Sequence, residues 1–173
     1  MATKAKKSST SGAARKSATG KTDAITLLKA DHAEVKKCFA DYQKLVDNDA
    51  EADERQELAD QICMMLTVHA TIEEEIFYPA AREALEEEEA DLIDEAEVEH
   101  ASAKDLIAQI QDGNPDEQLY DAKVKVLAEF VEHHVKEEQD EMFPKVKKAG
   151  LDLDALGEEL AQRKEELMAE EAA

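Results

Sequence analysis

Hydrophobic residues recur at helical spacing along most of the chain and divide it into four long segments and a shorter fifth one. The first segment covers about residues 23–47, and its apolar stripe comprises Ile25, Leu28, Val35, Phe39, Tyr42 and Val46. His32 falls on this stripe, so the spacing predicts that its ring points into the interior. Thr22 or Asp23 is placed to cap the start of the predicted helix.

A second segment over about residues 53–86 has the same periodicity, and Pro79 is expected to kink it or to break it into two. Its stripe consists of Leu58, Ile62, Met65, Leu66, His69, Ile72, Ile76 and Phe77. A third helix is predicted over about residues 90–111. It ends at residues 112–115, Asp-Gly-Asn-Pro, the strongest turn signal in the sequence.

The fourth predicted helix begins near Pro115, with Asn114 as its cap. It runs to about Lys148, and Gly150 closes it. A fifth, shorter helix is predicted over about residues 152–169, with apolar positions at Leu153, Leu156, Leu160 and Leu167. Four long helices joined by short loops favour an all-α, up-down-up-down antiparallel four-helix bundle with a short C-terminal fifth helix.

Composition agrees with an all-helical chain, because Gly (5 residues), Pro (3) and aromatic residues (4%) are scarce. Residues 1–22 differ from the rest, since they carry six basic side chains, no acidic ones and, after Met1, no large apolar residue. Such a segment cannot bury enough surface to offset the entropy lost on ordering. We therefore expect a disordered basic tail (1–22), a four-helix bundle (23–149) and a C-terminal helix (150–173).

All 43 acidic residues lie beyond the tail, and the net charge is −22. The bundle should therefore repel nucleic acid and anionic membranes, which leaves only a weak nucleic-acid contact through the tail. No apolar run approaches the roughly 20 residues that span a bilayer, and no signal sequence is recognisable. We expect a soluble, cytoplasmic monomer or homodimer. Cys38 and Cys63 lie beside apolar residues without CxxC spacing, so we expect reduced, buried thiols.

An internal repeat occurs in which Glu follows His by four residues and Pro follows the same His by ten. The two copies are His69, Glu73 and Pro79 in the second segment and His134, Glu138 and Pro144 in the fourth. The segment before each copy adds a histidine inside an acid-His-Ala triplet, namely His32 and His100. Four of the five histidines thus occupy repeat-related positions, which argues against isolated core histidines.

This spacing favours a metal site, since residues i and i+4 lie on one helix face, where an imidazole and a carboxylate can reach the same ion. Each carboxylate has two oxygens and could bridge two ions. The two histidines of each half are 37 and 34 residues apart, enough for the chain to turn and return to the same level. Six side chains are therefore predicted to converge in the core: His32, His69, Glu73, His100, His134 and Glu138.

The register of the fourth segment has an alternative, because His133 and Glu137 share the same i,i+4 spacing. Only His134 reproduces the ten-residue distance to proline. We therefore expect His133 either to be exposed or to contact a metal ligand without binding the metal itself.

Imidazole and carboxylate ligands suit iron, manganese or zinc better than magnesium or calcium, and no thiolate is placed to join them. Two histidines and two shared carboxylates would give each ion four protein ligands. Six-coordinate iron then keeps positions for a bridging oxygen and for O2, peroxide, nitric oxide or water. We expect two iron ions, with manganese or zinc as alternatives.

Over about residues 24–147 the sequence resembles the hemerythrin-like HHE cation-binding domains. The resemblance rests on the two isolated histidines and on the two His-x3-Glu-x5-Pro runs with their aromatic residue before the proline. It implies a four-helix bundle with a non-haem di-iron centre. The implied terminal ligands are His32, His69, His100 and His134, and the implied bridges are Glu73 and Glu138.

Two positions depart from the oxygen-carrying hemerythrins of marine worms. Lys104 stands where they have a second histidine in the third helix, and Gln139 stands where they have an aspartate in the fourth. Glu97, three residues before His100, is a candidate for an added ligand. With these departures, the sequence does not decide between reversible O2 storage and redox or peroxide chemistry.

Several functions are compatible with these residues, and whether the chain is an enzyme stays open. The first is binding or sensing of O2 or a related small molecule, including redox protection. The second is an enzyme that reduces peroxide or handles nitric oxide, with Glu74 or Glu137 as candidate proton relays. Iron storage or buffering would need more than two ions per chain, and a purely structural bundle would need none.

Overall fold

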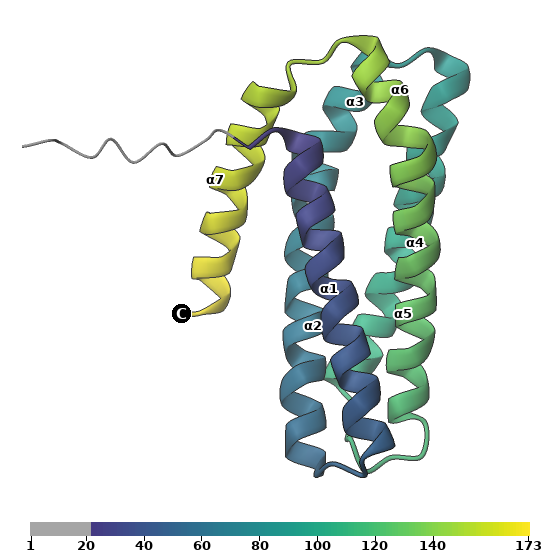
Figure 1. Ribbon diagram of the computed structural model, residues 1–173, viewed down its shortest axis with the longest axis vertical. Coiled ribbons are helices and arrows are strands. Elements are labelled where there is room, and N and C mark those ends of the chain that lie inside the picture. The colour runs from purple at the N-terminus through teal and green to yellow at the C-terminus, as the bar shows by residue number, and fades with distance from the viewer. Residues whose placement is uncertain (1–21) are drawn as a thin grey trace, which may run out of the picture.

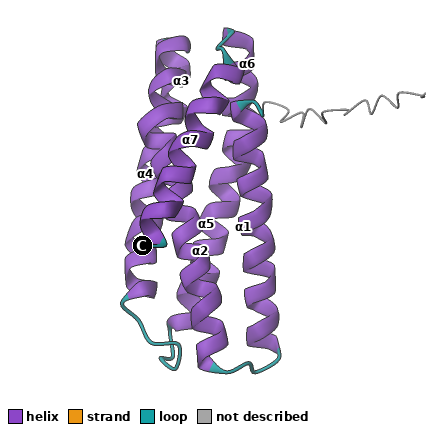
Figure 2. Ribbon diagram, turned by 90° about the vertical axis from the view of Figure 1, so that its left-hand side faces the viewer, coloured by secondary structure: helices purple, strands orange, loops and turns teal. Residues whose placement is uncertain are grey.

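The computed structural model describes residues 22–173, and all regular structure among them is helical. Four long helical segments run up, down, up and down, and a fifth helix lies along one side (Figures 1 and 2). This is the predicted all-α bundle with its C-terminal helix. The predicted disorder of residues 1–22 concerns residues that, apart from Thr22, lie outside the described part of the chain.

The first long segment is α1 and the third is α4, whereas the second and fourth each join three elements without a break. The bounds are α1 Ala24–Asp47, α2 Ala52–Ile72, η1 Glu73–Phe77, α3 Tyr78–Ala84, α4 Glu87–Gln111, α5 Tyr120–Glu137, η2 Glu138–Met142, α6 Phe143–Ala149 and α7 Leu153–Glu171. Helix α7 packs against α1 and α2. Among residues 22–173, no helix combines the length and the apolarity needed to cross a membrane.

Two predicted helix ends are confirmed by their local chemistry. Asp23 caps α1, because its side chain accepts a hydrogen bond from the backbone N–H of Thr26 at 2.9 Å. Gly150 ends α6 in the left-handed conformation, with φ of 82°, which costs glycine little because it has no Cβ.

The start of the fourth segment was predicted wrongly. Helix α5 begins at Tyr120 rather than near Pro115, and the Asn114 side chain closes a turn by accepting from the Asp116 N–H at 2.9 Å. Arg55 explains the difference, because it donates to the Pro115 carbonyl at 2.9 Å and so holds this stretch against the start of α2.

The two prolines do not break their segments, contrary to one of the predicted alternatives. Each lies in the first turn of a short α-helix that follows a π-helical turn, η1 or η2. The Tyr78 N–H bonds to the Glu73 carbonyl five residues back, and the Phe143 N–H bonds to the Glu138 carbonyl in the same way. A wider turn suits proline, whose ring would clash with the carbonyl four residues back in a regular α-helix.

The core consists of two apolar clusters, one toward each end of the bundle. One cluster includes Leu28, Ile72, Ile93, Phe143 and Leu160, and the other includes Val35, Ile62, Leu66, Ile110 and Leu127. Both cysteines are free, as predicted, but only Cys63 is fully buried, since Cys38 is half-buried beside Met65. Six buried polar side chains occupy the level between the two clusters.

Candidate metal centre

The six residues predicted from the repeat lie together between the apolar clusters. They are His32 on α1, His69 on α2, Glu73 at the start of η1, His100 on α4, His134 on α5 and Glu138 at the start of η2. All are buried, and the Glu73 side chain has no exposed surface. Burying two carboxylates in an apolar interior is costly unless positive charge compensates them.

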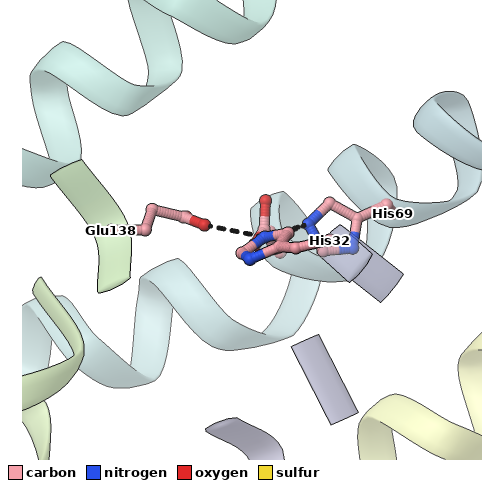
Figure 3. A group of neighbouring side chains, drawn as sticks. His32, His69 and Glu138 are labelled. Atoms are coloured by element: carbon pink, nitrogen blue, oxygen red, sulfur yellow. Dashed lines mark hydrogen bonds and ion pairs between the residues drawn. The ribbon is translucent and has the colours of Figure 1, made fainter. Parts of the chain in front are cut away.

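One histidine pair faces both carboxylates from α1 and α2 (Figure 3). The Nε2 atoms of His32 and His69 are 3.1 Å apart. His69 Nε2 lies 3.0 Å from Glu73 Oε1, and His32 Nε2 lies 3.2 Å from Glu138 Oε2. These four residues could therefore hold one ion between them.

The second pair comes from α4 and α5 and faces the other oxygens of the same carboxylates. The Nε2 atoms of His100 and His134 are again 3.1 Å apart. His100 Nε2 lies 3.2 Å from Glu73 Oε2, and His134 Nε2 lies 3.4 Å from Glu138 Oε1. Each carboxylate thus presents one oxygen to each histidine pair.

Three of the four histidines hold their outer nitrogen, Nδ1, against a carboxylate. The pairs are His69 with Asp31 (3.2 Å), His100 with Glu74 (2.9 Å) and His134 with Glu99 (2.7 Å). Such a partner orients the imidazole and keeps a proton on Nδ1, so Nε2 is left to bind a metal. A cationic or ionisable side chain contacts each carboxylate in turn: Lys164, Lys104 and His133 respectively.

The protonation of the metal-free centre also indicates a demand for positive charge. Burial lowers the pKa of His69 and His134, but neighbouring carboxylates outweigh it and raise these pKa values to about 10 and about 11. For Glu73 the signs are reversed: burial raises its pKa, but the adjacent imidazoles hold this pKa well below its ordinary value. In the metal-free centre, protons on the histidines therefore supply the positive charge that a bound metal would supply.

Two carboxylate oxygens show directly that protons alone satisfy the site incompletely. Glu73 Oε1 and Glu138 Oε2 are buried and accept no well-directed hydrogen bond from residues 22–173, although imidazole nitrogens lie 3.0 and 3.2 Å away. A metal ion accepts such oxygens without the angular demands of an N–H donor. The donor set of imidazoles and carboxylates therefore fits a bound metal cation.

His32 differs from the other three histidines because an amide supports it. The Gln139 side-chain nitrogen lies 3.0 Å from His32 Nδ1. The same amide can instead present its oxygen, which would accept the Nδ1 proton and leave Nε2 for a metal. Gln139, which stands where the worm hemerythrins have an aspartate, thus contacts the Nδ1 side of the predicted ligand His32.

Tyr78 is a member of the site that the sequence reasoning did not identify. Its hydroxyl donates to Glu138 Oε1 at 2.7 Å and to Glu73 Oε2 at 3.2 Å. It also lies 3.2 Å from His100 Nε2 and 3.4 Å from His134 Nε2. Burial, followed by the two carboxylates, raises the pKa of Tyr78 above its ordinary value, so the phenol is neutral in the metal-free chain.

The repeat makes the two halves of the centre similar but not identical. Phe143 stands at the repeat position of Tyr78, directly before the second proline. Its ring is parallel to that of His32, with centroids 6.0 Å apart, whereas the Tyr78 ring tilts by 37° against His100. One histidine pair therefore faces a hydroxyl and the other faces an apolar ring.

Two further candidates lie outside the centre. Glu97 is half-exposed and lies 3.5 Å from Arg82, so its proposed role as an added ligand is wrong. His133 is 64% exposed and contacts Glu99 and Glu137 at 3.3 Å each, a separate group at the surface. It supports the centre only indirectly, because Glu99 also contacts His134.

The fold and this donor set define a helical-bundle protein with a cation-binding site. The sequence model of the hemerythrin HHE cation binding domain matches residues 23–146, so the chain belongs to that family and the suspected resemblance is confirmed. A crystal structure of a hemerythrin HHE cation binding domain-containing protein from Mycobacterium kansasii is similar, with a TM-score of 0.72 and 25% identity. The match covers 86% of this chain and 89% of that one.

A curated relative is longer and carries a different description. A protein of Nostoc sp. (strain PCC 7120 / SAG 25.82 / UTEX 2576), described as a DNA nickase, is 31% identical over 122 residues. The match covers 70% of this chain but 32% of the relative. The chain therefore spans about a third of that protein's length.

Proposed function

We propose that the chain is a non-haem di-iron protein that binds O2 or a related small molecule for sensing, binding or redox protection. One observation supports the proposal most strongly. Each of the two fully buried carboxylates presents one oxygen to one histidine pair and its other oxygen to the other pair. Iron fits the mixed nitrogen and oxygen ligands and can change its oxidation state, whereas zinc cannot. Manganese fits the same ligands and is the main alternative.

The protein's own residues would hold and isolate such a centre. His32 and His69 would bind one ion, His100 and His134 the other, and the two carboxylates would be shared. A bound pair of iron ions would supply the electrons for oxygen chemistry. The apolar clusters above and below shield the centre from the two ends of the bundle.

A second candidate function, peroxide reduction, is favoured by Tyr78. Its hydroxyl is a buried proton donor 3.2 Å from His100 Nε2 and 3.4 Å from His134 Nε2. Such a donor could protonate an oxygen ligand there. Glu74 is a poorer relay than expected, because both of its oxygens contact Lys104 and one contacts the His100 ring.

Metal analysis with optical spectra, aerobic and reduced, tests the first proposal. We expect about two iron ions per chain and charge-transfer bands that disappear on reduction and return when O2 is admitted. Irreversible oxidation would contradict O2 binding, and a chain without iron would contradict the di-iron centre. Sustained peroxide turnover that falls in Tyr78→Phe, with its iron retained, would instead support the enzyme.

A further inference from the structure

A cavity of about 160 Å³ lies beside the metal centre and reaches all four of its histidines. Its walls come from α1, α2, α4 and α5, and α7 contributes to the rim. Most of the wall consists of apolar side chains, among them Val35, Met65, Leu66, Ala103, Ile107 and Val131. The centre therefore borders a mostly apolar chamber that opens to solvent beside the exposed side chains of Phe130 and Met168.

The chamber is larger than O2, peroxide or nitric oxide requires. One water molecule occupies about 30 Å³ of liquid, and a diatomic gas is of comparable size. An apolar cavity of about 150 Å³ in another protein stays dry and binds benzene. The volume and lining of this chamber therefore match a single aromatic ring.

The charges at the rim argue against an anionic ligand. Lys104 contacts Glu74 at 2.6 Å, and Lys164 contacts Asp31 at 2.5 Å, so the two lysines that line the chamber are already paired. An anionic ligand would have to break one of these pairs or bury its charge against apolar walls. The protein's net charge of −22 opposes anions in addition.

We propose that this chamber binds a neutral, apolar organic molecule about the size of one benzene ring, in contact with the histidines of the centre. The proposal rests on the proposed function only for its optical readout, since the chamber is built from protein side chains. Met64 and Met65 in the wall can adjust their flexible side chains to the shape of such a ligand.

The wall offers positions whose substitution fills the chamber without replacing a predicted ligand. Ala103→Leu adds three carbons from α4, and Val131→Phe adds a ring from α5, so the test does not depend on the folding of one variant. Ala108→Leu is the matched control, because Ala108 is an exposed position of α4 that does not line the chamber.

Calorimetric titration of toluene into the metal-loaded full chain tests the proposal, with benzoate as the charged analogue. We expect saturable binding of one toluene, at least about tenfold weaker in Ala103→Leu and in Val131→Phe, and unchanged in Ala108→Leu. Benzoate should bind at least about tenfold more weakly than toluene, a factor equal to about 1.4 kcal/mol.

Absence of saturable toluene binding, equal binding in the filled variants, or benzoate binding as tight as toluene would each overturn the proposal. Iron content and the O2-dependent bands are recorded on the same samples. Intact bands without toluene binding would reject the chamber ligand alone. Toluene binding without such bands would support the chamber ligand and reject the di-iron function.

Discussion

At the scale of single residues, Glu73 and Glu138 explain why the four histidines converge. Each carboxylate is a buried charge that needs positive charge beside it. With an oxygen toward each pair, each shares the positive charge of both sides of the site. The two glutamates therefore join two i,i+4 motifs into one centre.

Removing one shared carboxylate should empty both halves of the centre. We expect Glu73→Ala to lose metal from both positions, and by more than the roughly 10–100-fold in affinity that loss of a supporting partner costs. Glu75→Ala is the control, because Glu75 belongs to the same π-helical turn but contacts Arg163 at the surface. Metal content per chain is the measurement, and retention of one full equivalent in Glu73→Ala would contradict a shared bridge.

Metal binding should release protons at neutral pH. The pKa values of His69 and His134 are raised to about 10 and about 11, so both rings are protonated at pH 7 in the metal-free chain. A metal on Nε2 must displace these protons, and we expect about two per chain at pH 7, falling as the pH rises through 10 to 11.

Titrations in buffers of different ionisation enthalpy measure this release. The same protonation stabilises the metal-free fold fully below the ordinary histidine pKa of about 6.5, and this stabilisation is lost as the pH rises through 10 to 11. Release close to zero at pH 8 would contradict the raised pKa values.

At the scale of elements, the π-helical turns set the geometry of the centre. Each begins at a shared glutamate and ends just before an aromatic residue and a proline. The wider turn brings residues i and i+5 toward one face, so the Tyr78 hydroxyl reaches the Glu73 carboxylate on its own segment. The ten-residue spacing from histidine to proline thus has a structural cause.

Restoring the backbone N–H at one proline should weaken the centre. We expect Pro79→Ala to let η1 tighten toward α-helix, to move the Tyr78 hydroxyl off Glu138, and to reduce metal affinity by about tenfold. Pro115→Ala, in the turn before α5, serves as the control. Unchanged affinity in Pro79→Ala would show that packing, not proline, imposes the wide turn.

The sequence predicted the elements better than the contacts between them. The helices follow from the periodicity within each segment, and the six converging residues follow from the repeat between the two halves of the chain. Asp31 and Glu99 are the acids of the two acid-His-Ala triplets, so the repeat marked their positions. Each contacts the histidine of the next long segment, His69 or His134, and spacing along one helix does not reveal that contact. Tyr78 was missed because its direction depends on a π-helical turn, which i,i+4 reasoning does not contain.

At the scale of the whole molecule, helix α7 ties the C-terminal part of the chain to the centre. Lys164 on α7 contacts Asp31, which in turn supports His69. Leu160 is fully buried in the cluster that covers this side of the centre. Gly157 allows the close approach, since a Cβ there would lie 2.8 Å from the backbone nitrogen of Ala24.

Adding a Cβ at Gly157 should destabilise the protein. We expect Gly157→Ala to cost about 1–3 kcal/mol by overpacking, against the roughly 1 kcal/mol that alanine gains over glycine inside a helix. The midpoint of thermal unfolding should fall by several degrees. Iron content near the wild-type value would show that the lost stability comes from helix packing and not from the metal centre. A rise in the midpoint of thermal unfolding would contradict the close contact at Gly157.

Anomalous diffraction at the iron edge, from crystals of the iron-loaded chain, tests the shared centre most directly. We expect two peaks within the bundle, one between His32 and His69 and one between His100 and His134, with both carboxylates bound to each. A single peak, or a peak confined to the surface group around His133, would contradict the centre.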